Sequence, residues 1–366
     1  MKKVIVLACL FVISSTACKK DKGSDAGASG EIVIAAGGVH SLIVKADNTL
    51  WATGYNGNGQ LGDGTTTSRN AAVKIMDNVK MVSAGGNHSL IVKTDNTLWA
   101  VGGAADGQLG DGTNTNKSTP VKIMDNVKMV SAGGNHSLIV KTDNTLWATG
   151  YNAYGQLGDG TNTNKSTPLK IMDNVKTIMG GDNYTLIIKT DNTLWATGYN
   201  GAWQLGDGTN TSKSTPIKIM DNVQMISAGV YHSLIVKTDN TLWAVGYNLY
   251  GQLGDGITTY KSTPVKIMDN VKTISAGFYH SLIVKTDNTL WAVGNNFHGQ
   301  LGDGTKIDKT TAVKIMDNVT SVSAGHYFSL VIKTDNIVWA TGRNLTGQLG
   351  DGTNTERNVF TKMYLP

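Results

Sequence analysis

The sequence predicts an all-β protein, a seven-bladed β-propeller of four-stranded antiparallel blades, from three observations. A tryptophan recurs every 48 residues, so that seven copies of one unit account for residues 31–366. No copy has apolar residues at helical spacing over more than two turns. The first and last copies are as apolar as the middle ones, whereas an open array needs polar capping repeats. A closed ring therefore fits better than an open solenoid. The repeated tryptophans are Trp51, Trp99, Trp147, Trp195, Trp243, Trp291 and Trp339.

Each copy contains four short strand signals, illustrated here by the second copy. The expected strands are Lys80–Ala84, Ser89–Lys93, Thr97–Val101 and Pro120–Met124. Leu90–Val92 is apolar on both faces, as in a strand sandwiched between two layers. Asp95 and Asn96 tolerate the left-handed backbone of a tight hairpin turn. Because four short strands cannot bury both faces of their own sheet, neighbouring copies must stack.

The composition excludes several classes of protein. The chain has 44 Gly but only 5 Pro, which excludes collagen and indicates many tight turns. Its 8 Trp, 12 Tyr and 5 Phe exclude a disordered solvating chain. The net charge is +5, and no basic cluster lies in the repeats, so we expect no nucleic-acid partner.

The N-terminus carries an export signal. Lys2 and Lys3 precede the apolar run Val4–Ile13, and small residues follow up to Cys18. This segment resembles a bacterial lipoprotein signal, although Ser15 stands where leucine is usual. The resemblance implies removal of residues 1–17 and lipid modification of Cys18. The alternative is an ordinary cleaved signal with an incidental cysteine.

Residues 18–30 form the expected tether. After Cys18 they are polar and rich in Gly and Ser, with no apolar period, which is typical of a flexible linker. The propeller, residues 31–366, would then be held at a membrane by the lipid alone, in the bacterial cell envelope at the outer membrane or cell surface. Cys18 would be the only cysteine left after cleavage, so the folded body has neither a disulfide nor a thiol nucleophile.

The copies resemble the repeat of the regulator of chromosome condensation family. The resemblance rests on the segment A-G-x-x-H-S-L-I-V-K-T-D-N-T-L-W-A-x-G-x-N-x-x-G-Q-L-G-D-G-T and extends over all seven copies. It implies a seven-bladed propeller. Family members include a nuclear guanine-nucleotide exchange factor, a plant light receptor, ubiquitin ligases and a secreted bacterial β-lactamase inhibitor. Fold alone does not choose among these functions.

Five histidines occupy one repeat position, where copies four and seven have Tyr184 and Phe328. Because these side chains belong to separate blades, they cannot converge on one metal ion. We expect each to be buried and bonded to the backbone of its own blade. They are His40, His88, His136, His232 and His280.

Other candidate chemistry is equally repetitive. The acidic loops Asp111–Asn116 and Asp159–Asn164 lack the downstream Glu of a calcium loop, so we expect β-turns in which Asp accepts from nearby amides. G-Q-L-G-D-G lacks the Lys and the helix of a phosphate loop. We predict no catalytic residue, metal or cofactor.

The copies differ in two segments, which precede the histidine position and follow the tryptophan strand. In an up-and-down meander both segments emerge on one face of the disc, opposite the repeated T-D-N-T and M-D-N-V turns. Copies five to seven place aromatic residues there, and copies three and four extend the arc. Aromatic residues with polar tips are common anchors of interfaces. The predicted partner-binding residues are Tyr154, Trp203, Tyr231, Tyr250, Phe278, Tyr279, Phe297, His298, His326 and Tyr327. The alternative is that these rings plug the central channel or cover loops.

Trp203 replaces a glycine found at this loop position in the other six copies. If that glycine has a positive φ, tryptophan strains or reshapes the loop. Two interpretations stay open: a locally different loop, or a tryptophan kept for contact.

The sequence thus predicts a monomeric, membrane-anchored propeller that binds an unknown protein or glycan through its variable face. The alternatives are an inhibitor or regulator like the β-lactamase inhibitor or the exchange factor, a propeller lyase or hydrolase, and a structural surface protein. An enzyme would need a unique polar cluster at the mouth of the channel.

Overall fold

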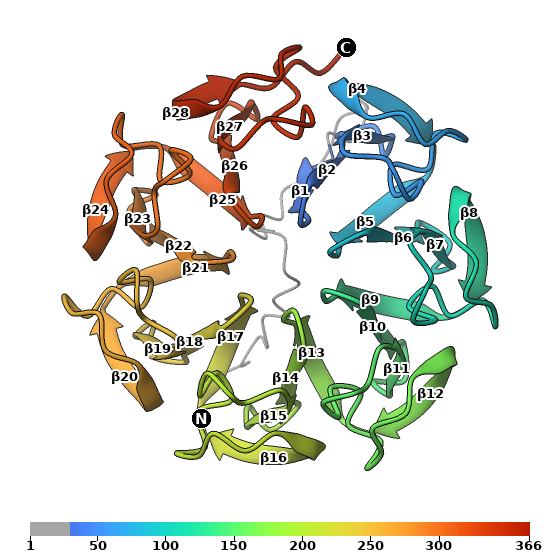
Figure 1. Cartoon of the computed structure of the whole chain (residues 1–366), viewed down its shortest axis with the longest axis horizontal. Coiled ribbons are helices and arrows are strands. Elements are labelled where there is room, and N and C mark those ends of the chain that lie inside the picture. Colours follow the sequence, from blue (N-terminus) through green and yellow to red (C-terminus); the bar gives the residue numbers. More distant parts are fainter. Residues whose placement is uncertain (1–29) are drawn as a thin grey trace, which may run out of the picture.

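The computed structural model describes residues 30–366, which form a ring of seven blades around a central channel (Figure 1). Blade one contains β1 (Val33–Ala36), β2 (His40–Val44), β3 (Leu50–Gly54) and β4 (Arg69–Met76). Blade two contains β5 (Val79–Ala84), β6 (His88–Lys93), β7 (Leu98–Gly102) and β8 (Lys117–Met124). Blade three contains β9 (Val127–Ala132), β10 (His136–Lys141), β11 (Leu146–Gly150) and β12 (Lys165–Met172). Blade four contains β13 (Val175–Gly180), β14 (Tyr184–Lys189), β15 (Leu194–Gly198) and β16 (Lys213–Met220).

The remaining blades follow the same order. Blade five contains β17 (Val223–Ala228), β18 (His232–Lys237), β19 (Leu242–Gly246) and β20 (Lys261–Met268). Blade six contains β21 (Val271–Ala276), β22 (His280–Lys285), β23 (Leu290–Gly294) and β24 (Lys309–Met316). Blade seven contains β25 (Val319–Ala324), β26 (Phe328–Lys333), β27 (Val338–Gly342) and β28 (Arg357–Lys362). The described residues contain no helix, and so none that could span a membrane.

Every blade is an antiparallel meander, which confirms the predicted fold. The four strands pair in chain order, with the first beside the channel and the fourth at the rim (Figure 1). The turns have the expected chemistry, since Asn96 in the hairpin between β6 and β7 has a φ of 66°, and Asn126 in the connection between blades two and three has a φ of 60°. The fourth strand starts earlier than expected, at Lys117 instead of Pro120. Pro120 is tolerated because this strand is at the edge of the sheet, where its register against β7 is irregular.

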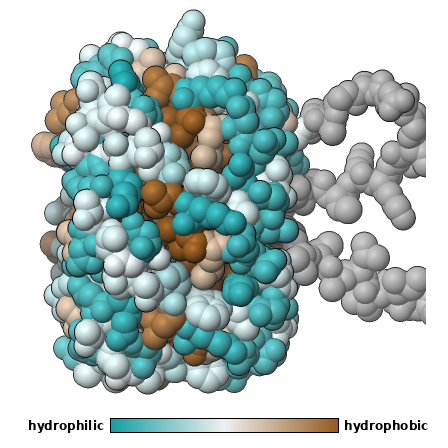
Figure 2. Space-filling model, turned by 90° about the vertical axis from the view of Figure 1, so that its right-hand side faces the viewer, coloured by the Kyte–Doolittle hydropathy of each residue, from teal (hydrophilic) through white to brown (hydrophobic). Residues whose placement is uncertain are grey.

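The hydrophobic core lies between blades instead of within them. Leu42 and Leu50 of blade one pack with Val79 and Ile91 of blade two, and the same arrangement recurs around the ring. The second strands are buried on both faces, as predicted from Leu90–Val92. At the rim beside β8 and β12, hydrophilic side chains surround short apolar bands (Figure 2).

Hydrogen bonds join each blade to the next. The Gly64 amide donates to the carbonyl of Ser118 at 2.9 Å, and the Ser89 hydroxyl donates to the carbonyl of Gln60 at 2.8 Å. The ring closes through the same contacts, because Gly352 donates to Asn70 at 2.9 Å and Ser41 to Gln348 at 2.7 Å. The first and last copies therefore form separate complete blades and share no sheet.

The disc has two different faces. The loop face carries the connections between first and second strands and between third and fourth strands. The turn face carries the Asp-Asn turns. The described chain enters at the turn face. Gly30 lies against Ala46, in the turn between β2 and β3, and from there β1 runs antiparallel to β2 toward the loop face. It also ends at the turn face, where the Lys45 ammonium donates to the carbonyl of Pro366 at 2.8 Å.

Candidate functional site

An aromatic network covers the loop face over blades five to seven. The Tyr279 ring is central, with centroid distances of 4.8 Å to Tyr250, 4.2 Å to Phe278 and 6.0 Å to Tyr231. Phe278 stacks on Tyr327 at 5.1 Å. These residues come from both variable segments, so the structure joins the two connections that the sequence placed on one face.

The network continues at both ends. On one side His298 contacts Tyr327 at 5.3 Å and Phe297 at 5.0 Å. On the other side Tyr247 stacks on Tyr260 at 4.7 Å, and Tyr260 contacts Trp203 at 5.5 Å. Eight of the predicted residues, together with Trp203, therefore belong to one chain of ring contacts, which includes His326 beside Phe278 at 5.2 Å.

Tyr154 is the predicted residue that stands apart. It packs against Tyr151 and Tyr199, at 6.2 Å and 4.9 Å, in a separate cluster over blades three and four. No ring contact joins this cluster to the aromatic network within residues 30–366.

Four tyrosines of these clusters were missed by sequence reasoning. Tyr151, Tyr199 and Tyr247 share a repeat position with Tyr55, so comparison of the copies assigns them to the scaffold. That position is nevertheless variable, since it holds Gly103, Asn295 and Arg343 in the other copies. Tyr260 lies in the loop before β20, outside both variable segments.

The rings are mostly fixed by one another. Of the ten predicted residues, Phe297 is 69% exposed and Tyr154 is 38% exposed, whereas the others are half-buried or buried. Burial raises the pKa of Tyr247 to about 12, with hydrogen bonding to Tyr260 as a further cause, and burial also raises the pKa of Tyr279. Both phenols therefore stay protonated at neutral pH, with hydroxyls able to donate and accept.

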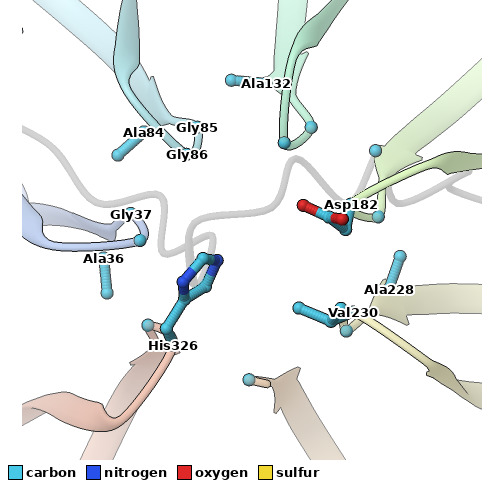
Figure 3. A pocket seen from close by; sticks show the side chains of 18 of the residues that line it. Ala36, Gly37, Ala84, Gly85, Gly86, Ala132, Asp182, Ala228, Val230 and His326 are labelled. Carbon is cyan, nitrogen blue, oxygen red and sulfur yellow. The ribbon is translucent and has the colours of Figure 1, made fainter.

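The central channel is narrow and lined mainly by small residues, at the ends of the first strands and in the glycine-rich connections that follow them (Figure 3). Its cavity volume is about 80 Å³. Asp182 and His326 project into it from opposite sides, with Val230 beside them (Figure 3). Of the ten predicted residues, all within the described chain, His326 alone lines the channel. The aromatic network thus lies to one side of the channel mouth, and of the predicted residues only His326 reaches into the channel.

A second cavity, of about 620 Å³, opens between the loops of blades five to seven. Its aromatic lining includes Tyr250, Tyr279, Phe297 and Tyr327. We call this cavity the loop pocket. Its polar lining residues are Asn295, His298, Lys306 and Asp308.

Lys306 and His298 are both bound by Glu356 of the next blade. The His298 Nδ1 lies 2.6 Å from one carboxylate oxygen, and the Lys306 ammonium donates to the other at 3.0 Å. Burial acts to raise the pKa of Glu356, but hydrogen bonds and charge from Lys306 and His298 together outweigh it and hold the pKa below its usual value. This trio is not part of the repeated scaffold, because copy three has Tyr154 and Asn162, and copy four has Ser212, at the equivalent positions.

The repeated histidines are buried, as predicted, but their bonds cross to the next blade. His88 Nε2 lies 2.9 Å from the hydroxyl of Ser137, which itself donates to the carbonyl of Gln108 at 2.6 Å. The serine must therefore accept from Nε2–H, so the expectation of a backbone partner in the same blade was wrong. Burial lowers the pKa of His88 to about 4 and that of His40 to about 3. These residues join neighbouring blades.

The acidic loops form turns, as predicted. Asp111 accepts from the amide and hydroxyl of Thr113 at 2.9 Å each. Within residues 30–366 no group of three His, Cys, Asp or Glu side chains is placed to hold a metal ion.

Trp203 keeps the loop geometry of the other copies. Its φ is 60°, against 78° for Gly155, and its amide donates to Asn200 at 2.9 Å just as Gly155 donates to Asn152. The interpretation of a locally different loop is therefore wrong. The backbone carries the strain of a side chain at positive φ, and the ring contacts Tyr260.

Comparison with known families agrees with the repeat pattern. Residues 15–316 match the RCC1-like domain, and residues 319–348 match the regulator of chromosome condensation (RCC1) repeat. The chain belongs to the RCC1-like domain family. A search of the curated proteins found no match to this RCC1-like chain.

Solved structures share the fold at low sequence identity. Human WBSCR16 is 18% identical, with a TM-score of 0.78 over 87% of this chain and 94% of its own. Prp20p from Saccharomyces cerevisiae, described with its binding to Gsp1p and histones, is 22% identical, with a TM-score of 0.74 over 82% of each chain. Yeast RCC1 (Prp20) bound to Kap60 is 19% identical, with a TM-score of 0.79 over 95% of this chain and 90% of that chain.

Proposed function

We propose that this RCC1-like propeller is an exported, lipid-anchored binding module of the bacterial cell envelope, which holds a protein or glycan through its loop face. The observation that carries the proposal is the aromatic network, a continuous set of ring contacts on one face of an otherwise repetitive scaffold. Large apolar groups gathered on one surface usually mark an interaction site. The yeast propeller Prp20, described with Kap60, Gsp1p and histones, shows that the fold can hold protein partners.

The position of the chain entry supports the anchored arrangement. Residue 30 lies at the turn face, and the aromatic network lies on the loop face. A lipid on Cys18, joined through residues 18–30, would therefore attach the side of the disc that faces away from the network. Cys18 and the signal segment lie outside the described residues, and the match to an export signal comes from the sequence alone.

Partner binding is tested with a matched pair of variants. Tyr247→Ala removes a ring from the network, and Tyr55→Ala removes a tyrosine from the same repeat position in blade one. Immobilised protein is exposed to envelope proteins and polysaccharides, and the retained molecules are identified. We expect Tyr247→Ala to lose the partner that both wild type and Tyr55→Ala retain. Equal retention by both folded variants would refute a role of the network.

Anchoring is tested separately by metabolic labelling with radioactive palmitate. The wild type should incorporate label and enter the membrane fraction, whereas Cys18→Ala should do neither. Label on the Cys18→Ala protein, or none on the wild type, would remove the lipid from the proposal and leave the binding face untouched.

A further inference from the structure

We propose that the loop pocket binds a neutral oligosaccharide, by stacking sugar rings on its aromatic walls and bonding their hydroxyls to its polar rim. This inference rests on the proposed binding function and specifies its ligand. The cavity of about 620 Å³ lies within the range of about 300–1,000 Å³ typical of small-ligand sites.

The walls offer flat apolar surfaces that are already in place. Tyr279 and Tyr250 are 4.8 Å apart and half-buried, and Tyr327 is held by Phe278 and His298. Phe297 stands at the rim, 69% exposed. Because the inner rings are fixed by neighbours, little side-chain entropy is lost when a ligand packs on them. The C–H faces of a pyranose ring are apolar and match such surfaces.

The rim mixes donors with acceptors, as vicinal hydroxyls require. Asp308 accepts from the Asn296 amide at 2.7 Å and from the Asn295 side chain at 3.2 Å, which fixes its carboxylate. It is exposed and retains capacity to accept further bonds. Lys306, on the same loop, supplies a donor.

The charges disfavour an anionic ligand. Lys306 is the one lysine among the lining residues, and it is paired with Glu356 at 3.0 Å. Asp308 adds a negative charge at the rim. A phosphate or acidic sugar would have to displace Glu356 and approach Asp308, whereas a neutral sugar would do neither.

The backbone around the pocket disfavours an extended peptide. All its lining residues lie in connections: Tyr279 precedes β22, Asn295–His298 follow β23, and Lys306–Asp308 precede β24. Peptides that add to a sheet need an accessible strand edge. This pocket presents side chains, which suits hydroxyl recognition.

The repeats supply substitutions that the loop is known to accommodate. Copy three has Ala153, Asn162 and Asn164 where copy six has Phe297, Lys306 and Asp308. The Asn164 side chain accepts a hydrogen bond from the backbone amide of Asn152 at 2.8 Å. Asp308 accepts the equivalent bond from the amide of Asn296. Leu345→Ala is the matched control for Phe297→Ala, because it truncates an exposed side chain at the same position of blade seven.

The test is an array of short neutral and anionic oligosaccharides, followed by calorimetric titration with the best neutral binder. We expect wild type to bind a neutral oligosaccharide and Leu345→Ala to bind it with the same affinity. Phe297→Ala and the double variant Lys306→Asn/Asp308→Asn should each bind it about tenfold more weakly.

Each other outcome overturns the inference. Binding of anionic sugars alone contradicts the charge argument, and unchanged affinity in the Phe297→Ala and double variants places the sugar elsewhere. If no sugar binds while Tyr247→Ala still loses a protein partner, the oligosaccharide is wrong and the proposed function stands. If neither a sugar nor a partner binds, both are wrong.

Discussion

At Trp203 one copy replaces the glycine of the other six copies with the largest side chain, yet the loop keeps its backbone conformation. Its φ of 60° lies in the region that glycine occupies at the same position, for example 76° at Gly251. A side chain there costs about 1–2 kcal/mol relative to ordinary backbone. The contact with Tyr260 offsets part of that cost, since aromatic pairs contribute about 0.5–1.5 kcal/mol.

Two substitutions at Trp203 separate strain from contact. Trp203→Gly removes both, so its free energy of unfolding should stay within about 1 kcal/mol of wild type. Trp203→Ala loses the ring and keeps the strain, so it should be less stable than Trp203→Gly by about 1 kcal/mol. Urea unfolding measures both. An alanine variant at least as stable as the glycine variant would contradict strain at this residue.

The buried histidines make stability depend on pH. Burial lowers the pKa of His40, His136, His232 and His280 to about 3 and that of His88 to about 4, from 6.5. Between these values the unfolded chain binds protons that the folded protein does not. The free energy of unfolding therefore suffers no penalty from these histidines well above pH 6.5. As the pH falls below 6.5 it decreases, by up to about 1.4 kcal/mol per pH unit for each histidine.

A single variant tests that origin. Phe328 occupies the same repeat position in blade seven, so His88→Phe has a precedent in this fold. Between pH 7 and about pH 5, the free energy of unfolding should fall less in His88→Phe than in wild type, by up to about 2 kcal/mol. Urea titrations at both pH values give the difference. An equal fall in both proteins would show that His88 is not the titrating group.

At the scale of the element, one asparagine organises the long loop between third and fourth strands in six of the seven copies. The Asn152 side chain donates to Asp159 at 3.0 Å and to the carbonyls of Thr161 and Thr163, and it accepts from the Leu157 amide at 3.0 Å. Six copies keep this asparagine, and copy two has Ala104 instead.

Exchanging these residues should move stability in opposite directions. Asn152→Ala leaves buried polar groups without partners and should lower the free energy of unfolding by about 1–3 kcal/mol. Ala104→Asn restores the bonding pattern of the other copies and should raise it by about 1 kcal/mol. Thermal and urea unfolding report both. Destabilisation by Ala104→Asn would show that the loop of copy two has repacked around alanine.

The strands could be predicted closely because their signals are local and repeated seven times. Trp99 and Leu90–Val92 define buried strands by side-chain type alone. The early start at Lys117 could not be predicted, since Thr and Ser there are compatible with either strand or loop. The bond from His88 to Ser137 was also beyond the sequence, because a repeat shows which residues are equivalent and not which side chains meet across two stacked copies.

At the scale of the whole molecule, comparison among copies predicted the face of the site but not its shape. It identified Tyr279 and Tyr327, because most other copies have a different residue at that position. It overlooked Tyr247, because three other copies also have tyrosine there. It could not reveal the loop pocket, because its lining residues come from three blades and Lys306 meets Glu356 only when two blades pack.

The closure of the ring makes the order of the blades along the chain physically arbitrary. Residue 30 lies beside Ala46, the Pro366 carbonyl binds Lys45, and blades one and seven meet through the contacts that join any other pair. A circular permutant can test this. It joins residue 366 to residue 31 through a short linker and opens the chain between Asp173 and Asn174, in the turn between β12 and β13. Followed by circular dichroism, it should unfold cooperatively near the wild-type temperature. Failure to fold would show that the break between blades three and four is not equivalent to the natural one. Success would make the turns between blades places to begin or end the chain, and so places from which to display an inserted peptide.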